Sequence, residues 1–200
     1  MKKVPVGVLI SGRGSNMEAL IAAAEDPDYP ARIALVLSNV ADAPGLAKAQ
    51  AAGIPTAVID HRPFGKDRAA HEARVDQTLR AAGVEIVALA GYMRVLTPYL
   101  VERWAGRMIN IHPSLLPAYP GLDTHARVLA DKGAVHGCSV HLVTAGVDEG
   151  PLLGQSEVPV LEGDDEATLA ARVLRAEHEL YPRCLSVLIR NLYRSGQTNT

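Results

Sequence analysis

The sequence predicts a single α/β domain: a mostly parallel, twisted sheet flanked by helices, with an antiparallel hairpin and a long final helix. Short β-branched runs alternate with segments of helical periodicity through the first half of the chain. The segment EIVALAGY, residues 85–92, is apolar on both faces, which is typical of a central parallel strand covered by helices. After about residue 136, two strand-like segments are separated only by a short turn, which favours a hairpin over another crossover.

The first half of the chain is expected to alternate four strands with four helices. Strands are predicted in the runs rich in aliphatic residues at Val4–Ile10, Ile33–Ser38, Ile54–Asp60 and Glu85–Tyr92. Helices are predicted at Asn16–Ala24, Ala43–Ala52, Lys66–Ala82 and Thr97–Ala105. Glycines follow the second and third of these helices, and a Thr-Pro pair opens the fourth.

The second half is expected to begin with a strand, Met108–Ile111, that runs directly into His112. The hairpin is predicted to pair Cys138–Thr144 with Leu152–Leu161, and a final helix is predicted from about Asp165 to Leu192. We therefore expect one domain over residues 1–194 and a disordered tail at 195–200.

Composition narrows the class of protein. The chain has 200 residues, of which 48% are hydrophobic and 21% charged, as in an ordinary globular domain. Its net charge is −2 and no long basic run occurs, which argues against nucleic acid as a partner. The apolar run at the start is broken by Pro5 and Gly7 and is too short for a signal or membrane segment. With Cys138 and Cys184 expected as reduced thiols, these features predict a cytoplasmic protein.

A glycine-rich turn, SGRGSN at residues 11–16, follows the first predicted strand. Gly12 and Gly14 allow close approach of a ligand to the backbone, and Ser15 and Asn16 are expected to cap the next helix. Free N–H groups there suit a phosphate, although a cap without a ligand is equally compatible with the pattern. A dinucleotide fingerprint is excluded because Met17 occupies its third glycine position, and no Gly-Lys-Ser/Thr follows as a P-loop requires.

Asn110 and His112 lie two residues apart, so on an extended backbone their side chains point to the same side. Pro113 keeps His112 out of the helical region and hence at a strand end. An amide that stabilises an oxyanion and an imidazole that moves a proton suit acyl transfer. Asp148, in a glycine-bounded turn, is a candidate to orient His112. The alternatives are a buried histidine satisfied by the backbone and an ordinary Asx-turn aspartate.

The other candidate residues give weaker signals. His125, His136 and His141 lack the spacing of a metal site, so we expect no metal. His61 and His71 are expected at the surface. Neither Ser11 nor Ser114 lies in a Gly-x-Ser-x-Gly elbow, which argues against a serine hydrolase.

Together these stretches resemble the phosphoribosylglycinamide formyltransferase family of folate-dependent enzymes. The resemblance runs from about Val4 to Leu192 and is carried by VLISGRGSN, LAGYMRVL, MINIHPSLLPAYPGLDTH, HGCSVHLVT, VDEGP and EHELYP. It implies a Rossmann-like formyltransferase fold, with ribonucleotide binding in the N-terminal half and folate binding in the C-terminal half. The chain departs from many relatives at Glu149, where they have Gly.

The resemblance also implies roles for individual residues. Asn110, His112 and Asp148 look like the catalytic trio. The phosphate and ribonucleotide would bind at Gly14, Ser15, Asn16 and Glu177. The folate would contact Arg68, Met93, Arg94, Val95, Leu96, Asn110, Thr144, Ala145, Gly146, Val147 and Asp148.

By this resemblance, 10-formyltetrahydrofolate is the co-substrate, and its formyl group passes directly to the amine of 5'-phosphoribosylglycinamide in purine (IMP) biosynthesis. The implied partners are these two small molecules, with no nucleic acid or membrane, for a monomer or homodimer. Alternatives are a formyltetrahydrofolate hydrolase, which usually has an N-terminal regulatory domain for which no room is expected before residue 4, and a non-catalytic folate- or nucleotide-binding module. A Rossmann oxidoreductase is disfavoured by the missing third glycine.

Overall fold

A computed structural model describes residues 2–194, so the predicted disordered tail at 195–200 lies outside the described residues. Within that range the chain forms one seven-stranded sheet with the strand order β3-β2-β1-β4-β5-β6-β7. The strands are β1 (Val4–Ile10), β2 (Ala31–Ser38), β3 (Thr56–Val58), β4 (Ile86–Leu89), β5 (Met108–His112), β6 (Val135–Leu142) and β7 (Leu152–Pro159). The α-helices are α1 (Ser15–Glu25), α2 (Pro44–Ala51), α3 (Arg68–Ala81), α4 (Pro98–Arg103), α5 (Thr124–Ala130) and α6 (Glu166–Arg194), and a short 3-10 helix spans Arg62–Phe64.

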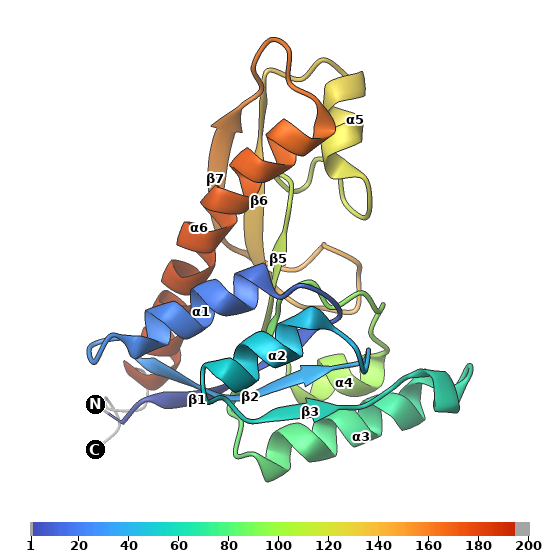
Figure 1. Ribbon diagram of the computed structural model, residues 1–200, viewed down its shortest axis with the longest axis vertical. Coiled ribbons are helices and arrows are strands. Elements are labelled where there is room, and N and C mark those ends of the chain that lie inside the picture. Colours follow the sequence, from blue (N-terminus) through green and yellow to red (C-terminus); the bar gives the residue numbers. More distant parts are fainter. Residues whose placement is uncertain (1, 195–200) are drawn as a thin grey trace.

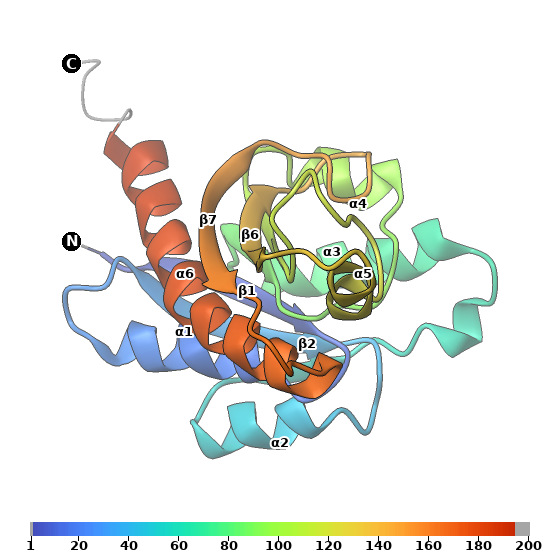
Figure 2. The ribbon, with the colours of Figure 1, turned by 90° about the horizontal axis from the view of Figure 1, so that it is seen from above.

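Helices cover both faces of the sheet (Figure 2). One hydrophobic cluster joins the strands to α1, α2 and α6, through residues such as Met17, Leu46 and Leu185. A second cluster, on the opposite face, packs Leu79 of α3 and Trp104, at the end of α4, against β1 and β4. Burial on both faces explains why β1 and β4 are apolar throughout.

Parallel and antiparallel pairing meet at β5. The strands β3, β2, β1, β4 and β5 pair in parallel, whereas β6 runs antiparallel to β5 and β7 antiparallel to β6. Figure 1 shows β6, β7, α5 and the first half of α6 rising together above the level of α1–α4. The predicted hairpin and the mostly parallel sheet are therefore confirmed.

Several boundaries differ from the sequence prediction. The third strand is limited to Thr56–Val58 and the fourth to Ile86–Leu89, since only these residues pair with their neighbours. The helix α5 was not predicted; it is only seven residues long and begins after Asp123, which has a left-handed φ of 56°. The predicted caps Ser15 and Asn16 instead lie inside α1, and Gly14, with φ 71°, occupies the N-cap position.

The prediction that His71 lies at the surface is wrong. His71 is buried under the 3-10 helix, where its Nε2 atom lies 2.8 Å from the Ile59 carbonyl and its ring packs edge-on against Phe64. Burial lowers the pKa of His71, which keeps the ring neutral.

None of the helices within residues 2–194 combines the length and the apolar character that crossing a membrane requires.

Tyr181 of α6 ties the helix to the centre of the sheet. Its fully buried hydroxyl donates to the Leu89 carbonyl of β4 at 2.7 Å and lies 3.2 Å from the Ile109 carbonyl of β5. The contact therefore fixes α6 against the two strands that lead to the polar loops described below.

We predict that Tyr181→Phe lowers the free energy of unfolding by about 1–3 kcal/mol, because it leaves buried carbonyl groups without their donor. Denaturant unfolding measures the change. Tyr193→Phe is the matched control: its hydroxyl bonds to Glu85 at the surface, and we expect a change within about 0.5 kcal/mol. Equal effects of the two substitutions would contradict the assignment.

Candidate active site

The polar loops predicted at strand ends meet at one place. The strand order brings β1, β4, β5 and β6 next to one another, and in an open α/β sheet ligands bind where the strand order reverses, here between β1 and β4. The loops after β1 and β4 are joined directly: Ser11 N–H donates to Gly91 O at 3.1 Å, and Met93 N–H donates to the Ser11 hydroxyl at 2.8 Å.

Four polar side chains converge at the end of β5. The Asp148 carboxylate lies between two imidazoles, with Oδ2 at 3.4 Å from His112 Nδ1 and Oδ1 at 3.5 Å from His141 Nε2. The Asn110 amide nitrogen lies 3.3 Å from the same His141 Nε2. The antiparallel register places Asn110 opposite His141 and explains this contact. The structure therefore brings Asn110, His112 and Asp148 together, as the sequence predicts, and adds His141.

The hydrogen bonds constrain the protonation of both rings. His141 Nδ1 lies 2.9 Å from Leu142 O and must donate to it, so in the neutral ring Nε2 accepts from the Asn110 amide. A protonated His141 would instead donate from Nε2 to Asp148. His112 Nε2 lies 3.0 Å from the Tyr119 carbonyl, which makes Nε2 a donor and leaves Nδ1, beside Asp148, as the nitrogen that gains or loses a proton.

Asp148 is held in place by the loop 119–122 as well. The Gly121 N–H donates to Asp148 Oδ2 at 2.9 Å, and Asp148 itself has a left-handed φ of 57°, a strained conformation that recurs at functional sites. Burial alone would raise the pKa of Asp148, but its interaction with His141, the hydrogen bond from Gly121 and the charge on His112 hold that pKa below its usual value. The carboxylate is therefore ionised at neutral pH.

The predicted phosphate-binding turn lies against α6. No side chain within the described part of the chain caps α1, whose first residue follows the left-handed Gly14. The side-chain amide nitrogen of Asn16 donates to Glu177 Oε2 at 3.0 Å. Its side-chain oxygen Oδ1 is buried and has no hydrogen-bond partner among the described residues. Burial raises the pKa of Glu177 to about 7, although the Asn16 hydrogen bond opposes the shift. The structure thus brings Gly14, Ser15, Asn16 and Glu177 together.

Apart from Asn110 of β5, the residues predicted to contact folate lie on three segments: Arg68, residues 93–96 and residues 144–148. Met93 and Val95 expose 66% and 58% of their surface, and Val147 exposes 54%. Large apolar side chains exposed in this way are available to bind a ligand. Arg68 is exposed at the first position of α3, whereas Arg94 and Leu96 are half-buried.

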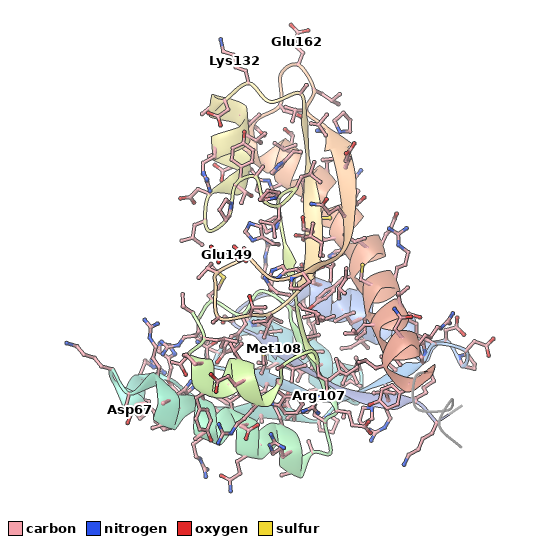
Figure 3. The ribbon with its side chains drawn as sticks, turned by 180° about the vertical axis from the view of Figure 1, so that it is seen from behind. Asp67, Arg107, Met108, Lys132, Glu149 and Glu162 are labelled. Carbon is pink, nitrogen blue, oxygen red and sulfur yellow. The ribbon has the colours of Figure 1, made fainter. Side chains whose placement is uncertain are left out.

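A cavity of about 350 Å³ borders Asp148 on the side of the β6–β7 loop. It is lined by Leu116, Pro117, Pro120, Val147, Asp148, Glu149, Gly150 and Leu152. Figure 3 labels Glu149 on this loop, between Lys132 near one end of the molecule and Met108 toward the other. The Glu149 carboxylate folds over Gly146, where an added Cβ would lie 2.1 Å from its oxygen, so the glycine makes room for this side chain.

His141 is the member of the site that sequence reasoning missed, because its place depends on long-range pairing with β5. Two further histidines form a separate pair: His125 Nδ1 of α5 lies 3.1 Å from His136 Nε2 of β6, and the two rings pack edge to face. Burial, with the charges of the neighbouring rings, lowers the pKa of His136 to about 4. The side chains of residues 2–194 form no group of three or more His, Cys, Asp or Glu arranged to hold a metal ion.

The chain is similar in sequence and in fold to known proteins. Residues 4–185 match the family described as formyl transferase. The chain belongs to the formyl transferase family. A crystal structure of phosphoribosylglycinamide formyltransferase from Brucella melitensis is 52% identical, with a TM-score of 0.90 and coverage of 94% of this chain and 96% of that chain.

Two curated relatives show how the formyl transferase domain occurs in longer and shorter proteins. Phosphoribosylglycinamide formyltransferase of Escherichia coli (strain K12) is 44% identical over 90% of this chain and 84% of its own length. The trifunctional purine biosynthetic protein adenosine-3 of Bos taurus is 45% identical over 98% of this chain, but the match covers 19% of that protein. The chain therefore spans about a fifth of the length of this trifunctional relative.

We predict that the His125–His136 pair makes this formyl transferase domain less stable in mild acid. His136 takes up its proton near pH 6.5 when unfolded but only near pH 4 when folded, so its contribution is complete above pH 6.5 and is lost as the pH falls toward 4. Between pH 7.5 and 5, the free energy of unfolding of the wild type should fall by about 2 kcal/mol more than that of His136→Gln. Denaturant titrations at both pH values measure this difference; parallel pH curves would contradict the lowered pKa.

Proposed function

We propose that this chain transfers the formyl group of 10-formyltetrahydrofolate to the amine of 5'-phosphoribosylglycinamide. The observation that carries the proposal is the convergence of Asn110, His112 and Asp148 at the end of β5, beside the uncapped start of α1. Relatives that are 52% and 44% identical over nine-tenths of the chain are named phosphoribosylglycinamide formyltransferase. The product is the N-formyl ribonucleotide, and tetrahydrofolate is released.

The ribonucleotide binds between α1 and α6. Backbone N–H groups at a helix start, together with the positive end of the helix dipole, favour a phosphate, and Gly14, Ser15 and Asn16 supply them here. Glu177 faces the same turn across the Asn16 amide and contacts the ribose or phosphate. With a pKa near 7, the Glu177 carboxyl group is able either to donate to or to accept from a sugar hydroxyl.

The folate binds on the other side of the catalytic side chains. Its pterin lies between Met93–Leu96 and the loop Thr144–Asp148. Both segments expose apolar side chains: Met93 and Val95 on the first, and Val147 on the second. Arg68, exposed at the start of α3, contributes a positive charge toward the acidic tail of the folate. No resident metal takes part.

The reaction proceeds by direct attack. The glycinamide nitrogen bonds to the formyl carbon, and the carbonyl oxygen becomes an oxyanion that the Asn110 amide stabilises by donating a hydrogen bond. Protonated His112 assists, and ionised Asp148 supports the imidazolium. The bond between the formyl carbon and the folate nitrogen then breaks as the proton lost by the amine passes to that nitrogen, so no covalent enzyme intermediate forms.

In the cell, we place this step in purine biosynthesis in the cytoplasm. The protein acts on two small molecules as a monomer or homodimer, without nucleic acid or membrane as a partner. The net charge of −2 and the absence of a long basic run support this part of the proposal.

The direct test is a spectrophotometric assay of folate deformylation with and without the ribonucleotide. We expect turnover only when the ribonucleotide is present, with one formylated product formed per tetrahydrofolate released. Turnover that does not depend on the ribonucleotide would indicate a hydrolase. Binding of both ligands without turnover would indicate a non-catalytic module.

We predict that His112→Ala abolishes formyl transfer while binding of the ribonucleotide largely survives. The substitution removes the imidazole but leaves Gly14, Ser15, Asn16 and Glu177 in place. Steady-state assays and calorimetric titration with the ribonucleotide measure the two effects separately. Near-normal turnover by the folded variant would overturn the mechanism.

We predict that Asp148→Asn lowers kcat by about 100-fold or more and displaces the pH–rate profile, because it removes the charge beside His112 and His141. The profile is measured as kcat against pH for wild type and variant. Asp28→Asn, an exposed aspartate in the turn after α1, serves as the control and should change neither quantity. An unchanged profile for Asp148→Asn would remove the role assigned to this carboxylate.

A further inference from the structure

The segment from Tyr119 to Leu122, here called the 119–122 loop, is bonded to two of the three proposed catalytic residues. The Tyr119 carbonyl lies 3.0 Å from His112 Nε2, and the Gly121 N–H donates to Asp148 at 2.9 Å. Both contacts use backbone groups. Their geometry is therefore set by whatever holds the loop, rather than by the identity of its side chains.

Arg127 of α5 holds this loop from the outside. Its terminal nitrogen Nη1 donates to Pro120 O at 2.6 Å and lies 3.3 Å from Leu122 O, so one guanidinium nitrogen reaches the carbonyl groups on both sides of Gly121. The same guanidinium lies over the Tyr119 ring, 5.3 Å from its centroid. Asp131, directly after the end of α5, accepts a hydrogen bond from the Tyr119 hydroxyl at 3.0 Å.

These contacts hold a conformation that is unfavourable on its own. Tyr119 has φ 52°, in the left-handed region that a bulky residue rarely adopts, and such a conformation is unfavourable unless its surroundings fix it. Charge-assisted hydrogen bonds and stacking of an arginine on an aromatic ring are able to offset that cost. The Tyr119 carbonyl points to His112, while its half-buried ring lies under the Arg127 guanidinium and packs edge-on against His136.

We propose that Arg127 is a positioning residue for formyl transfer: by clamping the 119–122 loop, it keeps the Tyr119 carbonyl on His112 and the Gly121 N–H on Asp148. Arg127 is exposed and lies on the outside of the loop, so it acts on the reaction only through these backbone groups. The inference rests on the proposed function, because it assigns a task within that reaction.

Loss of the clamp has a defined chemical consequence. Without the Tyr119 carbonyl, His112 Nε2 no longer has a fixed acceptor and the neutral ring distributes its proton between both nitrogens. Without the Gly121 N–H, Asp148 loses one of the hydrogen bonds that oppose the effect of its burial, so its pKa rises. The ribonucleotide site at Gly14–Asn16 and Glu177 shares no contact with Arg127 among the hydrogen bonds described above.

The test compares Arg127→Met, which keeps an unbranched apolar side chain but removes the charge and the donors, with Arg127→Lys, which keeps a charge and donors without the planar stacking group. Arg32→Met removes an exposed arginine at the opposite end of the sheet and is the matched control. For each variant we measure kcat and KM for the ribonucleotide across pH. The tautomer of His112 is measured by ¹H–¹⁵N NMR of the histidine rings, and the thermal midpoint is recorded.

We expect Arg127→Met to lower kcat by about 10- to 100-fold with little change in KM, as a misplaced catalytic group does. The acidic limb of its pH–rate profile should move to higher pH, and the Nε2–H tautomer of His112 should give way to a mixture. Arg127→Lys should recover part of kcat and of the tautomer preference. Arg32→Met should match the wild type.

Two results would overturn the inference: an unchanged kcat for Arg127→Met, or a lower kcat that follows a fall in thermal midpoint while the pH profile and tautomer stay as in the wild type. Failure of the proposed function is distinguished from these, because it would appear as lack of transfer by the wild type itself. The NMR measurement tests the clamp independently of activity.

Discussion

The site depends on one buried carboxylate. Asp148 is an anion with a side chain that is only 10% exposed, and an isolated charge in such a place would be costly. Its two oxygens are therefore shared among partners from three segments: His112 at the end of β5, His141 of β6 and the Gly121 N–H of the 119–122 loop. The carboxylate is tolerated because these partners offset its burial. In turn it draws them to one point, so the strand end, the hairpin and the loop are mutually positioned.

The change from parallel to antiparallel pairing makes that convergence possible. After the connection that contains α5, β6 runs antiparallel to β5 and places His141 directly opposite Asn110. The β6–β7 loop then folds back far enough for Asp148 to meet both rings. A hairpin therefore delivers the carboxylate to a proposed catalytic centre whose other strand ends belong to the parallel part of the sheet.

Local patterns predicted the parts of the structure that local forces determine. Two-residue periodicity placed Asn110 and His112 on the same side of β5, where both belong to one polar cluster, and the alternation of apolar runs predicted the parallel sheet. By contrast, α5 was missed because its seven residues are too few to be helical through propensity alone, and tertiary contacts such as burial of Val128 hold it in place. The register between β5 and β6 joins residues 31 positions apart, so the sequence had no local signal for His141.

Two carboxyl groups of the proposed site are buried yet shifted in opposite directions. Glu177 has the Asn16 amide as its donor and no cation among the causes of its shift, so burial prevails and raises its pKa to about 7. Asp148 is less deeply buried and has a backbone donor and two imidazoles, so its pKa is lowered although burial opposes the shift. The contrast suits the proposed tasks. A group that recognises sugar hydroxyls gains from being either donor or acceptor, whereas a group that supports an imidazolium must keep its negative charge throughout the reaction.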